Sequence, residues 1–170
     1  NVPVSIALFS LVNVNTAPDK SITFAGDRYN YINQLLISRK FNDKLSLQLM
    51  PTVVHFNKVP YGPKNDNEVY SIGLGGKYKM SDNTNLIFEY SRQLNMYENV
   101  MTSTGSILNY QPDLLSVGVE MNSGGHQFRL FVGNTTYSSN VDQLTRNTKS
   151  IAEGNFAIGF TINRSTFLKN

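Results

Sequence analysis

The chain has 170 residues, with 15 Lys or Arg against 12 Asp or Glu, a net charge of +3, and no cysteine or tryptophan. The lack of cysteine excludes a disulfide framework, a thiolate metal site and a cysteine nucleophile. The small net charge, without a dense Lys/Arg block, gives no reason to expect nucleic acid as a partner. The longest apolar runs, such as residues 4–12, are far shorter than the ~20 residues of a transmembrane helix, so this chain could span a membrane only with strands.

Alternation of apolar and polar side chains recurs about eight times and predicts as many strands. In chain order the alternating segments are residues 4–14, 31–41, 45–53, 70–80, 86–91, 115–121, 127–133 and 155–163. Tight turns at 42–44, 81–83 and 122–125 alternate with long polar segments at 16–28, 57–68, 95–113 and 137–153. Short turns at one end and long loops at the other are typical of an antiparallel up-and-down transmembrane β-barrel. Pro51 interrupts the third strand and predicts a bulge or kink there.

Three features favour lipid on the apolar face over the alternative, a soluble lipocalin-like ligand carrier with its apolar face inside. First, the opposite face is too small and polar to fill a dry interior. Second, the charges that share the apolar face lie near strand ends, where long side chains can reach the interface. Third, tyrosines gather at the long-loop ends, as in an interfacial girdle. The small polar positions are Ser71, Gly73, Gly75, Ser116, Gly118, Gly133 and Gly159, and the charges are Arg39, Arg92 and Arg164.

The run LSVGVEMNSGGHQFRL at 115–130, followed by GNT at 133–135, resembles the most recognisable segment of an uncharacterised outer-membrane β-barrel family of Bacteroidota. Residues 34–52 and 154–160, with Arg164, resemble the same family. The resemblance implies one barrel domain over residues 1–170 that corresponds to the C-terminal two-thirds of a larger barrel of about 12 strands. Because the chain begins at Asn1, without Met or a signal pattern, we expect a processed or truncated product.

Polar side chains of the inward face form the first candidate site, a lumen cluster of Glu89, Glu120, Gln127 and Arg129. If residues 122–125 form a four-residue turn, Glu120 faces Gln127, and Arg129 lies diagonal to Glu120. Such a cluster could be the selectivity or gating constriction of a pore. The alternative is an ionic network that fills a narrow lumen and pairs its own charges.

A basic rim at the short-turn end is the second candidate, formed by Arg39, Lys40, Lys44, Lys77, Lys79, Arg164 and Lys169. It would meet anionic phospholipid headgroups of the inner leaflet, or be ordinary snorkelling charge. His126, after the Gly124-Gly125 turn, and His55, near a long-loop end, have no second ligand at metal-site spacing, which favours structural roles.

We therefore expect a non-enzymatic barrel of the bacterial outer membrane, either a narrow pore or a structural or accessory subunit of an outer-membrane assembly. Its expected partners are outer-membrane lipid and other outer-membrane or periplasmic proteins, with no cofactor, metal or catalytic residue. The alternative is an outer-membrane enzyme that modifies lipid or acyl chains. No G-x-S-x-G motif supports it, and it requires a hydroxyl group within hydrogen-bond reach of His55.

Overall fold

The eight predicted strands form one antiparallel sheet in a computed structural model that describes residues 3–16, 23–59, 66–95, 100–101, 107–108, 113–137 and 139–164. The strands of this sheet are β1 (Ser5–Val14), β2 (Tyr29–Lys40), β3 (Leu45–Phe56), β4 (Glu68–Lys79), β5 (Thr84–Gln93), β8 (Leu114–Ser123), β9 (His126–Gly133) and β10 (Ala157–Arg164). A separate small hairpin pairs β6 (Val100–Met101) with β7 (Ile107–Leu108). The helical elements are η1 (Ala25–Arg28), α1 (Asn140–Thr145) and η2 (Ile151–Glu153). None of the described helices is long and apolar enough to cross a bilayer.

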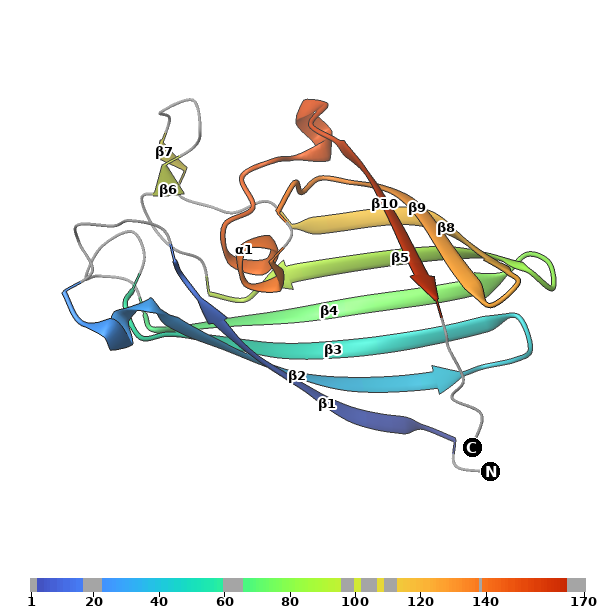
Figure 1. Cartoon of the computed structure of the whole chain (residues 1–170), viewed down its shortest axis with the longest axis horizontal. Coiled ribbons are helices and arrows are strands. Elements are labelled where there is room, and N and C mark those ends of the chain that lie inside the picture. Colours follow the sequence, from blue (N-terminus) through green and yellow to red (C-terminus); the bar gives the residue numbers. More distant parts are fainter. Residues whose placement is uncertain are drawn as a thin grey trace.

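Each strand of the sheet pairs with its neighbours in chain order, so the predicted up-and-down topology is confirmed. The sheet curls into a half-barrel (Figure 1). Its order is β1-β2-β3-β4-β5-β8-β9-β10, and in the described part of the chain β1 and β10 each pair on one side only. The two edges of the sheet are therefore open.

One row of directly paired residues shows both the tilt of the strands and which face points inward. It starts at the first residue of β1, at the short-turn end, and finishes at the first residue of β10, at the long-loop end. From each strand to the next, the row therefore moves about one residue closer to the long-loop end. With ~3.3 Å per residue and ~4.8 Å between strands, this shift corresponds to a strand tilt of roughly 35° from the barrel axis. Its members are small or polar: Ser5, Ser38, Gln48, Gly75, Glu89, Ser116, Gly133 and Ala157.

Burial is inverted relative to a water-soluble protein. Among the described residues only seven hydrophobic side chains are buried, against ten polar or charged ones. The exposed apolar side chains lie on the convex face of the strands, for example Leu49, Leu74 and Val117. This placement is opposite to that of the lipocalin-like alternative, which needs its apolar face inside. A convex face of this kind requires lipid around it.

The concave side has an apolar region that the sequence analysis did not expect. Near the long-loop ends of β2, β3 and β4, inward-facing Ile32, Val54, Phe56 and Val69 form a buried cluster with Val141 of α1. The small polar inward face that was predicted holds at Gly75, Ser116 and Gly133, although Ile87, Leu114 and Phe131 also line the cavity. It is wrong for this end, because a helix from the β9–β10 connection packs there.

Pro51 does not produce the predicted bulge. The β2–β3 register is the same before and after it, with Gln34 opposite Thr52 and Ile37 opposite Leu49. The ladder only lacks pairs between these positions, because proline has no N–H to donate. The turn before β3 is formed locally, since the Asn42 side-chain oxygen accepts hydrogen bonds from the backbone N–H groups of Lys44 and Leu45, both at 2.8 Å.

Candidate functional site in the barrel interior

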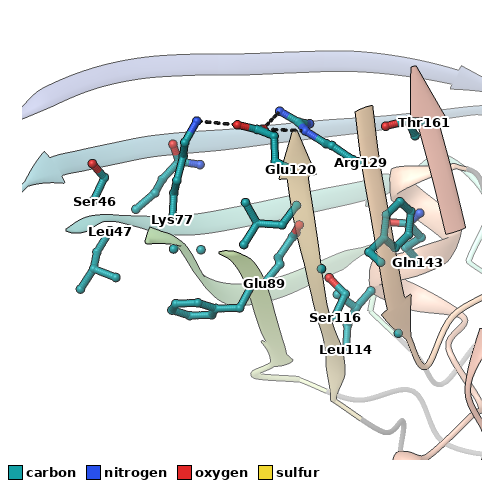
Figure 2. A pocket seen from close by; sticks show the side chains of 18 of the residues that line it. Ser46, Leu47, Lys77, Glu89, Leu114, Ser116, Glu120, Arg129, Gln143 and Thr161 are labelled. Atoms are coloured by element: carbon teal, nitrogen blue, oxygen red, sulfur yellow. Dashed lines mark hydrogen bonds and ion pairs between the residues drawn. The ribbon is translucent and has the colours of Figure 1, made fainter. Parts of the chain in front are cut away.

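The concave face lines a partly open cavity of about 780 Å³. Strands β2, β3, β4, β5, β8, β9 and β10 and helix α1 contribute to its wall, and most of the contributing side chains are polar (Figure 2). The cavity contains all four residues of the predicted lumen cluster, Glu89, Glu120, Gln127 and Arg129.

Glu120 is the centre of the charge arrangement. Its side chain is only 2% exposed, and its carboxylate receives Lys77 Nζ at 2.5 Å and Arg129 Nη2 at 2.9 Å. Asn85 Nδ2 adds a hydrogen bond of 3.2 Å to the same carboxylate. Figure 2 shows Glu120 between the two cations. A buried carboxylate needs such compensation, because an unpaired charge away from water is strongly unfavourable.

The β8–β9 turn sets this geometry, and the expected register there is wrong. Only Gly124 and Gly125 form the turn, both with positive φ (56° and 80°), as a two-residue type I′ hairpin turn requires. Ser123 therefore pairs with His126, and Glu120 lies directly opposite Arg129 instead of diagonal to it. The two-residue difference brings the opposite charges into contact.

Lys77 is the residue that the sequence analysis assigned elsewhere. It lies on β4, inside the barrel, and its ammonium crosses β5 to reach Glu120 on β8. Asn85 was also missed. Its position opposite Glu120 in the β5–β8 ladder could have been deduced only from the register across the long 95–113 segment.

The other two members of the predicted cluster stand apart from this centre. Gln127 donates from Nε2 to Asn122 Oδ1 at 3.3 Å. Glu89 lies in the cavity between Gly75 and Ser116 of the neighbouring strands. In the described part of the chain it has no ion-pair or hydrogen-bond partner, so its carboxylate is available to solvent and solutes in the cavity.

At the short-turn end, three charges of the predicted rim have local partners. Lys40 contacts Asp43 at 3.0 Å, Lys79 contacts Asp82 at 2.7 Å, and the Arg39 guanidinium lies 5.1 Å from the centre of the Phe41 ring. The hydrogen bonds from these lysines lower the pKa of Asp43 and of Asp82 below the usual value. Lys44 is the last residue of the β2–β3 turn and Arg164 ends β10, while Lys169 lies outside the described residues.

A comparison with protein-family models matches residues 1–166 to a family described as "Membrane bound beta barrel domain (DUF5777)". The chain belongs to this family. Neither the curated proteins nor the solved structures gave a match. The protein is thus a membrane-bound β-barrel domain, in agreement with its inverted burial, and the family description assigns it no reaction or ligand.

The two histidines of this DUF5777 domain have ordinary protein partners. His126 stacks on Phe128 with ring centres 6.1 Å apart. His55 Nδ1 lies 2.9 Å from Glu68 Oε1, at the long-loop end and on the convex face. His55 also lies beside the ring of Tyr31, with ring centres 6.1 Å apart, and in the described part of the chain no hydrogen bond joins it to the hydroxyl group that the enzyme alternative requires. Within the described ranges, no group of three or more His, Cys, Asp or Glu could hold a metal ion.

Proposed function

We propose that this protein is a narrow pore of the bacterial outer membrane that passes ions and small polar solutes. The observation that carries the proposal is the polar cavity on the concave side of a sheet whose convex side is apolar. Membrane barrels of this up-and-down type, with short turns at one end and long loops at the other, occur in bacterial outer membranes. The resemblance of residues 115–135 favours a bacterium of the Bacteroidota.

The interior charges supply a basis for ion selectivity. Lys77 and Arg129 keep 48% and 41% of their side-chain surface exposed, whereas their shared partner Glu120 is almost fully enclosed. Solutes in the cavity thus meet two accessible cations and the accessible carboxylate of Glu89. Charged rings and clusters of this kind determine which ions enter a pore.

The test is the conductance of the purified protein in planar lipid bilayers under a potassium chloride gradient. Arg129→Ala removes a cavity cation, so the reversal potential is expected to shift toward greater cation selectivity. Arg164→Ala is the matched control, because Arg164 is an exposed arginine at the end of β10 and does not line the cavity. An equal reversal potential in both variants, or no conductance in any of them, would refute the pore.

The open sheet edges favour a second role, as a structural or accessory subunit of an outer-membrane assembly. Unpaired backbone groups cost several kcal/mol each in lipid, so the outer edges of β1 and β10 require partner strands. These strands would come from further residues of the same polypeptide, as the resemblance implies, or from another outer-membrane protein. The intact mass of the protein purified in mild detergent from its native membrane tests this. A companion protein, present at fixed stoichiometry, supports the subunit role, and a protein that always purifies alone contradicts it.

A further inference from the structure

Helix α1 lies inside the barrel. It belongs to the connection between β9 and β10, at the long-loop end, and it folds back against the concave face of the sheet (Figure 1). It contacts both β2 and β5, which are separated in the sheet by β3 and β4. A six-residue helix therefore bridges the inward face of four neighbouring strands.

The seat of α1 is apolar. Val141 is 1% exposed and belongs to the cluster formed by Ile32, Val54, Phe56 and Val69. Leu144, on the same face of the helix, packs at the border of this cluster. A helix of six residues is unstable by itself, so its position depends on this tertiary burial. Val141 is the fully buried apolar side chain of the helix.

Two polar contacts attach the helix on opposite sides. Asn13 of β1 donates from Nδ2 to Ser139 Oγ, just before the helix, at 2.7 Å. Gln93, at the end of β5, donates from its side-chain amide to the backbone carbonyl of Leu144. These two hydrogen bonds connect the helix and the residue before it to the edge strand β1 and to β5.

The face of α1 that points away from the apolar seat borders the polar cavity, since Asn140 and Gln143 are among the cavity residues. The helix therefore stands between the cavity and the long-loop end of the barrel. We infer that α1 is a plug that constricts the conduction path at this end, so that the cavity communicates mainly with the short-turn side. This inference rests on the proposed pore function.

The first test loosens the plug in the full protein. Val141→Asp places a carboxylate in the apolar seat and is expected to raise potassium chloride conductance in planar bilayers several-fold. Ile151→Asp adds the same charge to the same β9–β10 connection, at an apolar side chain that is 44% exposed and is not among the cavity residues, and is expected to leave the conductance within twofold of the wild type. Circular dichroism and mobility on unheated gels show whether both variants keep the barrel.

The second test fixes the plug and does not depend on tolerance of a buried charge. Because the chain has no cysteine, Asn13→Cys combined with Ser139→Cys gives a unique pair for a short bifunctional thiol reagent. Cross-linking is expected to succeed with the pair in the wild-type background, to fail after Val141→Asp, and to leave conductance at or below the wild-type level. Each single-cysteine variant, treated with the same reagent, is the control.

The outcomes separate the two proposals. Conductance that is equal in wild type and Val141→Asp, or a pair that does not cross-link in the folded wild-type background, overturns the plug and leaves the pore intact. If Val141→Asp loses the cross-link but neither protein conducts, the pore itself is refuted, and the plug with it.

Discussion

Removal of the Glu120 charge tests the energetic role of the interior ion cluster. Glu120→Gln keeps the volume of the side chain but leaves Lys77 and Arg129 without their shared counterion. Removing one partner of a fully buried ion pair costs about 3–5 kcal/mol. Since the two cations keep 48% and 41% of their surface exposed, water compensates part of this, and we expect a loss of roughly 2 kcal/mol, or about 30-fold in the unfolding equilibrium.

Asp82→Asn is the matched control, because the Lys79–Asp82 distance of 2.7 Å lies between the 2.5 Å and 2.9 Å of the two Glu120 pairs while Asp82 is 93% exposed. Exposed pairs contribute little to stability because water and salt screen them, so no measurable change is expected. The assay is urea unfolding of the protein refolded in lipid vesicles, followed by far-UV circular dichroism and by the fluorescence of its nine tyrosines. Equal destabilisation by the two substitutions would refute the argument that burial makes the Glu120 cluster different.

Three further substitutions test the facing, the packing and the electrostatics of the strands. Leu74→Arg, on the convex face at mid-strand, is expected to cost about 2–4 kcal/mol in vesicle refolding, whereas Ser116→Arg, which points into the cavity, costs far less; the reverse order would mean that the faces are exchanged. Gly118→Ala would place its Cβ 2.5 Å from a backbone oxygen of β9, so less folded protein is expected on unheated gels, and a wild-type yield would contradict the packing. Lys79→Ala is expected to raise the pKa of Asp82 toward its usual value, measured by carboxyl-carbon NMR. Because the pKa of Asp82 is lowered in the folded protein, the Lys79–Asp82 pair stabilises the fold at pH values above the unfolded-state pKa of Asp82. This stabilisation is lost as the pH falls through the folded-state pKa. An unchanged pKa of Asp82 in the Lys79→Ala variant would exclude the lysine as the cause of the shift.

The strands and their facing could be predicted because both follow from local rules. Alternation of apolar and polar residues indicates which side chains share a face of the sheet. A turn residue such as Asn42 forms its turn locally, because its side-chain oxygen accepts hydrogen bonds from the backbone N–H groups of Lys44 and Leu45. The uninterrupted register at Pro51 shows the limit of such rules. A missing donor removes ladder hydrogen bonds, but whether the strand also bulges depends on how firmly its neighbours hold the register.

The interior could be predicted only in part, because its contacts depend on distances across several strands. Glu120 and Arg129 were assigned to one cluster, but their direct pairing depends on whether two or four residues form the turn at Gly124-Gly125. Lys77 was placed at the rim because the pattern of its own strand gives no sign of a carboxylate two strands away.

Helix α1 could not be predicted from the sequence. Six helical residues are too few for a periodic signal, and the partners of Val141 lie about 70 to 110 positions away along the chain.

The directions of the two edge strands restrict how the sheet can become a closed barrel. β1 runs from the short-turn end to the long-loop end, and β10 runs the opposite way. Closure with antiparallel pairs throughout therefore admits only an even number of added strands, zero included, whatever their source. A single inserted strand would run parallel to one of the two edges, so the antiparallel pairing around the barrel would be broken at that edge.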